Sequence, residues 1–194
     1  MNTPFQLPRG IAPLLDDSGI AFKPVAGYTM TSVSDQKWTH FFRAACSIED
    51  MDSLLAALVD VCLPESFYAI LCGHWFGDRI DTYLSDFLPR SQIKSAFSPH
   101  LPTLIHDGMV GHGFACYDSQ RHEEIFLDDH KELTVLTSVP FAVAEVFSNH
   151  GISRNDSLEF LSQHGHVHTN LAGSEARYCH EIIQTLNMKA VDYS

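Results

Sequence analysis

The sequence lacks the features that mark membrane proteins, secreted proteins and nucleic-acid-binding proteins. No window approaches the roughly 18 consecutive apolar residues of a membrane span, and the start of the chain has no cationic segment followed by an apolar run. Lys and Arg number 12 against 24 acidic residues, which gives a formal charge of −12. Because such a charge repels phosphate backbones, we expect no nucleic-acid partner. The missing apolar span and secretory signal lead us to expect a cytoplasmic protein without a membrane partner.

Cysteine is scarce and irregularly spaced. The five cysteines are an odd number, at Cys46, Cys62, Cys72, Cys116 and Cys179. Neither a disulfide framework nor a CxxC metal knuckle can be built from this spacing. We therefore expect reduced thiols, as in a reducing cytoplasm.

Nucleotide-binding and serine-hydrolase motifs are also missing. The two glycines within residues 106–112 match neither phosphate-loop pattern, and the chain has no Gly-x-Ser-x-Gly elbow. Function must therefore be sought in less specific patterns.

Composition and length predict one globular α+β domain. The 194 residues are 45% hydrophobic and 19% charged, as in ordinary folded proteins. Residues 1–24 contain four prolines and two glycines, which predict an irregular N-terminal arm packed on a domain of residues 25–194.

Periodicity predicts a mainly antiparallel sheet of hairpins with packed helices. Period-two patterns and turn residues indicate strands at 25–33, 37–45, 79–87, 113–118, 124–128 and 132–137. Helical spacing or caps indicate helices at 51–62, 91–97, 140–151, 156–163 and 174–188. Residues 66–75 fit a strand or a helix, and Gly73 with its β-suited neighbours favours the strand.

A short sequence pattern occurs twice, and it reflects either chance or two weakly related ββα units. Asp35-Gln36-Lys37 and Asp129-His130-Lys131 each precede a predicted strand that is followed by a predicted helix. Ser47-Ile48-Glu49-Asp50 offers a capping box for the helix in the first unit.

The chain has 12 histidines, and the densest group is His164-Gly165-His166-Val167-His168. On a strand, alternate residues share a face, so His164, His166 and His168 could hold one divalent metal ion. The HxH pair resembles the metal sites of cupins, although cupins place an acid and a further histidine differently. A histidine-rich polar loop is the alternative, and the prediction for cofactors is none apart from this candidate metal.

A second pattern places Cys62, His112 and Asp128 in the order cysteine, histidine, acid. This order resembles papain-like and transglutaminase-like enzymes over residues 62–129. The resemblance implies a cysteine hydrolase or transferase in which a helix N-terminus activates Cys62 and Asp128 orients His112. It requires a helix at residues 66–75, and a structural cysteine in an apolar stripe is the alternative.

A third pattern is a segment of acidic residues without basic ones. The segment 44–78 has no Lys or Arg but has six acids, namely Glu49, Asp50, Asp52, Asp60, Glu65 and Asp78. Glu49, Asp52 and Asp60 fall off the apolar stripe of their helix and are predicted to point outward. In composition the chain resembles small cytoplasmic inhibitors and toxin-neutralising immunity proteins. The favoured prediction is a non-catalytic binding or inhibitory domain that presents this acidic face to a basic protein, with the cysteine enzyme as the alternative.

Overall fold

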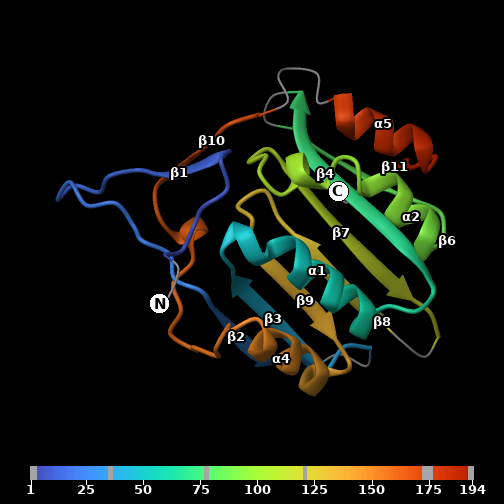
Figure 1. Ribbon diagram of the computed structural model, residues 1–194, viewed down its shortest axis with the longest axis horizontal. Coiled ribbons are helices and arrows are strands. Elements are labelled where there is room, and N and C mark those ends of the chain that lie inside the picture. The colour runs from blue at the N-terminus through green and yellow to red at the C-terminus, as the bar shows by residue number, and fades with distance from the viewer. Residues whose placement is uncertain (1–3, 35–36, 77–78, 120–121, 172–176, 192–194) are drawn as a thin grey trace.

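A large antiparallel sheet crosses the computed structural model (Figure 1), in the strand order β11-β5-β4-β7-β8-β9-β3-β2, with β6 paired to β4. The structure describes residues 4–34, 37–76, 79–119, 122–171 and 177–191. The strands of this main sheet are β2 (Gly27–Ser32), β3 (His40–Ala45), β4 (Ser66–Phe76), β5 (Arg79–Leu84), β6 (Leu88–Pro89), β7 (Val110–Tyr117), β8 (His122–Leu127), β9 (Leu133–Thr137) and β11 (Lys189–Val191). The predicted α+β class is confirmed.

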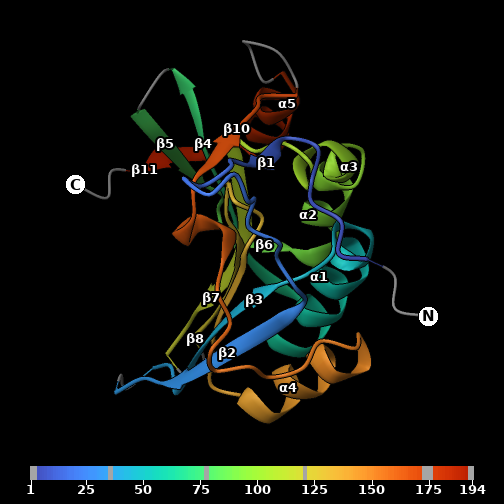
Figure 2. The same cartoon turned by 90° about the vertical axis from the view of Figure 1, so that its left-hand side faces the viewer.

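Helices cover one face of the main sheet (Figure 2). They are α1 (Ile48–Cys62), α2 (Arg90–Phe97), α3 (Leu101–Leu104), α4 (Pro140–Asn149) and α5 (Arg177–Thr185). Strands β8 and β9 alternate buried and half-buried residues, so that Ile125, Leu127 and Val135 face the helices. Among the described residues, no helix combines the length and the apolar character needed to cross a membrane.

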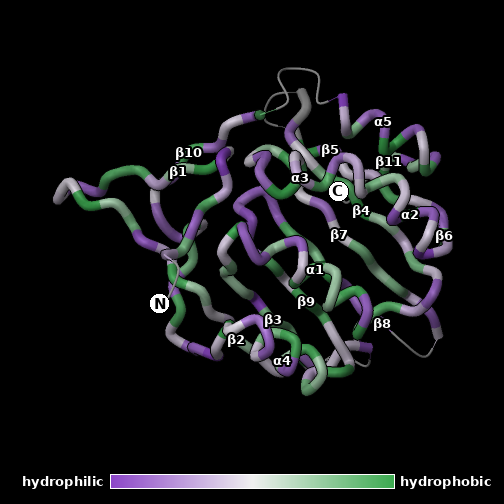
Figure 3. Tube along the Cα trace, viewed as in Figure 1, coloured by the Kyte–Doolittle hydropathy of each residue, from purple (hydrophilic) through white to green (hydrophobic). Residues whose placement is uncertain are grey.

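Helix α1 packs its apolar stripe on the sheet as predicted. Met51, Leu54 and Leu58 are fully buried, and hydrophobic and hydrophilic positions alternate along the helix (Figure 3). The predicted capping box does not form, because the Ser47 hydroxyl accepts a hydrogen bond from the backbone N–H of Gln6 instead.

A two-stranded ribbon stands apart from the main sheet. Strand β1 (Ile11–Pro13) pairs with β10 (His166–His168) and with no other strand among the described residues. We use "the ribbon" for these two strands with the loop 14–22 that projects from the body in Figure 1. The N-terminal arm thus contains a short strand, where the sequence predicted irregular structure.

Residues 66–75 lie in strand β4, which confirms the favoured hairpin over the helix. The helix predicted at 156–163 is wrong, because that segment holds only the 3-10 turn η1 (Leu161–Gln163). Residues 35–36, residues 77–78 and the start of the helix predicted at 174–188 lie outside the described residues.

The two predicted ββα units occur as β2-β3-α1 and β8-β9-α4. They meet along the antiparallel pair β3–β9, with His40 opposite Thr137 and Ala44 opposite Leu133. The strand order β8-β9-β3-β2 places the units side by side. The ββα topology therefore occurs twice in the part of the sheet that ends at β2.

Candidate metal centre

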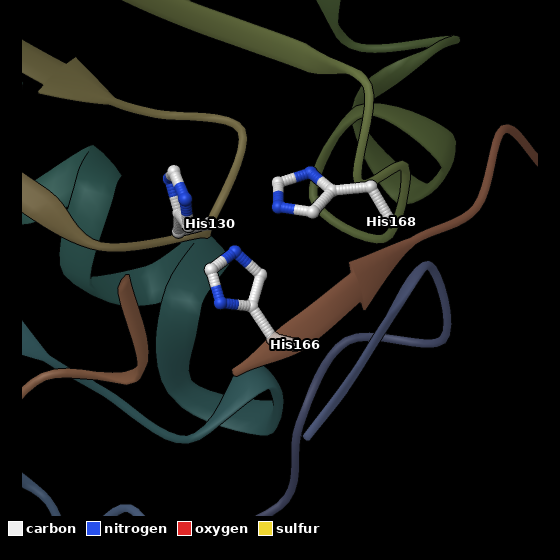
Figure 4. A group of neighbouring side chains, drawn as sticks. All are labelled: His130, His166 and His168. Carbon is white, nitrogen blue, oxygen red and sulfur yellow. The ribbon is translucent and has the colours of Figure 1, made fainter. Parts of the chain in front are cut away.

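Three imidazole rings from two distant segments meet at the junction of the ribbon and the main sheet. His166 and His168 flank Val167 on β10, so both side chains leave the same face of that strand. His130 lies in the turn between β8 and β9. The ring centroids are 4.8 Å apart for His130 and His166, 4.8 Å for His130 and His168, and 4.9 Å for His166 and His168. Figure 4 shows the three rings around a common space.

The β8–β9 turn is held by its own polar groups. Asp128 accepts a hydrogen bond from the backbone N–H of Glu132 at 2.8 Å, and Lys131 adopts a positive φ of 58°. The Lys131 side chain is buried and its ammonium donates to the carbonyl of Val110. These anchors fix the backbone on both sides of His130, so its ring is positioned by the turn.

Each of the three rings has an oxygen acceptor at its Nδ1 atom. Nδ1 of His166 lies 2.7 Å from the carbonyl oxygen of His164, and Nδ1 of His168 contacts the carbonyl oxygen of Gly108. Nδ1 of His130 lies 2.9 Å from the Asp129 carboxylate. In a neutral ring whose Nδ1 donates its proton to that oxygen, Nε2 has a lone pair. Metal-binding histidines in proteins have this arrangement.

The spacing of the rings fits one ion. One nitrogen from each of His130, His166 and His168 can be chosen so that all three lie within 4.8 Å of one another. A tetrahedral ion with metal–nitrogen bonds of about 2.0–2.1 Å needs nitrogens about 3.3 Å apart. Each ring would therefore move inward by less than about 1 Å, which side-chain rotation can supply.

Acidic groups surround the histidines. The second carboxylate oxygen of Asp129 lies 3.7 Å from Nε2 of His74 and 3.8 Å from Nδ1 of His168. Hydrogen bonds to Asp128 and Asp129 outweigh burial and raise the pKa of His130 to about 10. Burial acts to raise the pKa of Asp129, but the hydrogen bond from His130 and the nearby imidazoles lower it to about 2. A cation at this place would therefore lie beside ionised carboxylate.

The structure brings together two of the three predicted metal ligands and replaces the third. His164 points away, because its ring stacks on Phe22 with centroids 3.9 Å apart and its Nε2 lies 3.7 Å from Glu159. His130 takes the third place, which the sequence analysis did not predict. A histidine next to two acids in a turn was the available signal, but its contact with β10 depends on the tertiary fold.

The structure does not bring Cys62, His112 and Asp128 together. Cys62 is the last residue of α1 and is buried in the core, near the end of the sheet where β4 begins. Asp128 follows β8 at the opposite end, since β4 and β8 both run antiparallel to β7. The eight residues of β7 separate these ends by about 25 Å. Cys62 also lies at a helix C-terminus, where the dipole does not favour a thiolate.

Glu49, Asp52 and Asp60 are exposed on the solvent side of α1, as the sequence predicts. Two of the three already have partners in the chain. Glu49 accepts a hydrogen bond of 2.7 Å from the Gln6 side chain, and Asp60 pairs with the Arg90 guanidinium. The acidic surface is consequently less open than the segment 44–78 alone indicates.

Comparisons with protein-family models, with curated proteins and with solved structures found no match for this chain.

Proposed function

We propose that this protein binds one divalent transition-metal ion through Nε2 of His130, His166 and His168. The observation that carries the proposal is the oxygen acceptor at each Nδ1, which leaves Nε2 of three adjacent rings for the ion. At His130 the ion displaces a proton from Nε2, as metal ions do when they bind protonated ligands. Imidazole suits Zn²⁺, Cu²⁺ and Ni²⁺, whereas Mg²⁺ and Ca²⁺ prefer oxygen ligands. Three protein ligands leave a fourth position for water or another small ligand.

Asp129 supports this site as a positioning residue. It accepts from Nδ1 of His130 at 2.9 Å and is itself close to His74. A carboxylate behind a ligating histidine fixes the orientation of the ring and increases its basicity. The negative charge of Asp129 also offsets part of the charge of a bound cation.

The test is a zinc titration of protein purified without a histidine tag and stripped with a chelator. Wild type is expected to bind one Zn²⁺ per chain, and His130→Ala, His166→Ala and His168→Ala should each weaken binding by more than about 100-fold. His164→Ala is the matched control, because its ring lies outside the cluster, and it should bind as wild type does. Unchanged affinity in His130→Ala would contradict the proposal, as would a wild type that binds no Zn²⁺.

A second candidate function is supported by the exposure of Glu49, Asp52 and Asp60. We propose that this surface of α1 docks a basic protein, in the manner of an inhibitor or immunity protein in the cytoplasm, where five thiols stay reduced. Exposed charges of one sign mainly raise association rates and make them sensitive to salt.

Its test compares the Glu49→Lys, Asp52→Lys, Asp60→Lys triple variant with wild type, using a basic protein captured at low salt. Association should slow sharply in the variant, and added salt should reduce the difference between the two proteins. Equal association rates at low salt would leave the acidic surface with solubility as its only role.

A further inference from the structure

Few contacts attach β1 and β10 themselves to the main sheet, although the backbone N–H of Ser162, shortly before β10, donates to Glu132 at 2.9 Å. The backbone N–H of Gly10 donates to the carbonyl of His106 at 2.8 Å, and the N–H of Arg9 donates to the His106 ring at 3.1 Å. Ile11 of β1 is buried, but Leu14, Leu15 and Ile20 farther out on the ribbon are 50%, 67% and 63% exposed. Hydrophobic burial therefore contributes little to holding the outer ribbon, and segments with few buried apolar contacts open most readily.

The three histidines lie across this attachment. His166 and His168 belong to the ribbon, whereas His130 belongs to a turn of the main sheet. Because β10 pairs with β1 and with no strand of the main sheet among the described residues, its position does not depend on a shared ladder. An ion bound by all three rings would therefore join two elements that few other contacts join.

The contact that docks the ribbon also orients one ligand. A Cβ atom on Gly10 would lie 2.4 Å from the backbone nitrogen of Gly108, so the backbones of these two segments pack directly against each other. The carbonyl of the same Gly108 accepts from Nδ1 of His168. Movement of the ribbon away from Gly108 would break this hydrogen bond and carry His168 away from His130.

We infer that the metal ion is a clasp that holds the ribbon against the main sheet, so that loss of the ion releases the ribbon. This inference rests on the proposed metal site and adds a structural consequence to it. Binding and docking are linked in both directions, because an ion that favours the docked ribbon must itself bind more tightly when the ribbon is docked. The ion thus controls how residues 10–22 and 164–169 are presented to solvent.

Hydrogen exchange of the wild-type protein tests the first direction. The reporting amide is Gly10, whose N–H donates to the carbonyl of His106 at 2.8 Å across the attachment, whereas the amides of Leu14 and Thr169 donate within the ribbon. Removal of Zn²⁺ by a chelator should speed exchange at Gly10 by about 10-fold or more. Peptides from β7, in the middle of the main sheet, should exchange equally in both states. Equal exchange rates at Gly10 with and without bound Zn²⁺ would contradict the inference that the ion holds the ribbon against the main sheet.

A Gly10→Ala variant tests the second direction without changing a ligand. The added methyl group meets the backbone of Gly108, so the ribbon should dock less well and the Zn²⁺ affinity should fall by about 5- to 150-fold. Leu15→Ala is the matched control, since that side chain is exposed on the same ribbon, and its affinity should equal that of wild type.

The outcomes separate the clasp from the metal site. If wild type binds Zn²⁺ and Gly10→Ala binds it equally well, the clasp is wrong and the metal site stands. If wild type binds no Zn²⁺, the proposed function itself fails. Should Gly10→Ala not fold, hydrogen exchange of wild type decides the matter alone.

Discussion

The rings of His130 and His168 meet edge to face, with centroids 4.8 Å apart and planes at 90°, although one residue lies in a turn of the main sheet and the other on the ribbon. Neither segment could bind a metal ion tightly alone, because each offers at most two imidazoles. The site thus depends on how the ribbon docks. The proposed metal site is therefore connected to the conformation of the N-terminal arm.

We expect Asp129→Asn to weaken Zn²⁺ binding by about 10- to 100-fold without unfolding the protein, because the amide keeps an acceptor for His130 but loses the negative charge. A competition titration with a chromogenic chelator measures this change. The control is Asp156→Asn, which removes the same charge at an exposed position beside Arg154 and should bind Zn²⁺ as wild type does. Equal affinities for the two variants would mean that Asp129 does not act on the site.

The sequence predicted the fold class and most elements because their signals are local. The apolar stripe of α1 and the alternation in β8 and β9 each arise from residues within one segment. The helix predicted at 156–163 is absent because contacts with distant residues decide the conformation of this segment. Two of its buried apolar residues, Leu158 and Phe160, pack with Ala45 in a small cluster of their own, so tertiary packing decided the conformation.

The site was predicted only in part, for the same physical reason. His166 and His168 share a face because alternation on a strand is a local property. His164 was expected to join them, but it stacks on Phe22 of the N-terminal arm. His130 joins the cluster through the docking of the ribbon, a contact between distant segments that no spacing in one sequence reveals.

Buried His112 predicts a pH dependence of stability. Burial and the charge of Lys131 lower the pKa of His112 to about 3, and neither of its ring nitrogens has a hydrogen-bond partner among the described residues. Below pH 6.5 His112 is protonated in the unfolded chain, whereas it stays neutral in the folded protein until the pH approaches 3. The free energy of unfolding should therefore fall as pH drops from 6.5 toward 3, by up to about 1.4 kcal/mol per pH unit from this group.

Replacing His112 with Phe should remove this contribution. The ring already packs against Phe97 and Phe114 at centroid distances of 6.0 and 6.3 Å, so an apolar ring suits the environment. Urea unfolding at pH 7 and at pH 5 measures the effect, and His112→Leu serves as a second apolar variant. We expect a smaller loss of stability at pH 5 in both variants than in wild type. Parallel losses in all three proteins would refute the assignment of this pH dependence to His112.

The acidic residues of α1 should differ in their effects on stability. Glu49→Lys with Asp52→Lys should leave the melting temperature within a few degrees of wild type, because both side chains are exposed. Asp60→Lys removes the ion pair with Arg90 and places two cations together, at a cost of about 1 kcal/mol or less. Thermal unfolding distinguishes these cases. A large loss of stability in the double variant would show that the α1 surface packs against part of the chain.

The reactivity of the thiols provides the last prediction and also tests the cysteine-enzyme alternative. None of the five cysteines forms a disulfide, and Cys72 is half-buried whereas the other four, including Cys62, are buried. Burial raises the pKa of Cys46 to about 12 and also raises the pKa of Cys72, so no activated thiolate is expected at either. Protein denatured without reductant should show about five free thiols, whereas the native protein should react slowly and first at Cys72. A Cys72→Ala variant should lose this first phase of labelling. Rapid labelling of Cys62 in native protein would contradict its place in the core, because a catalytic thiolate must be both ionised and accessible.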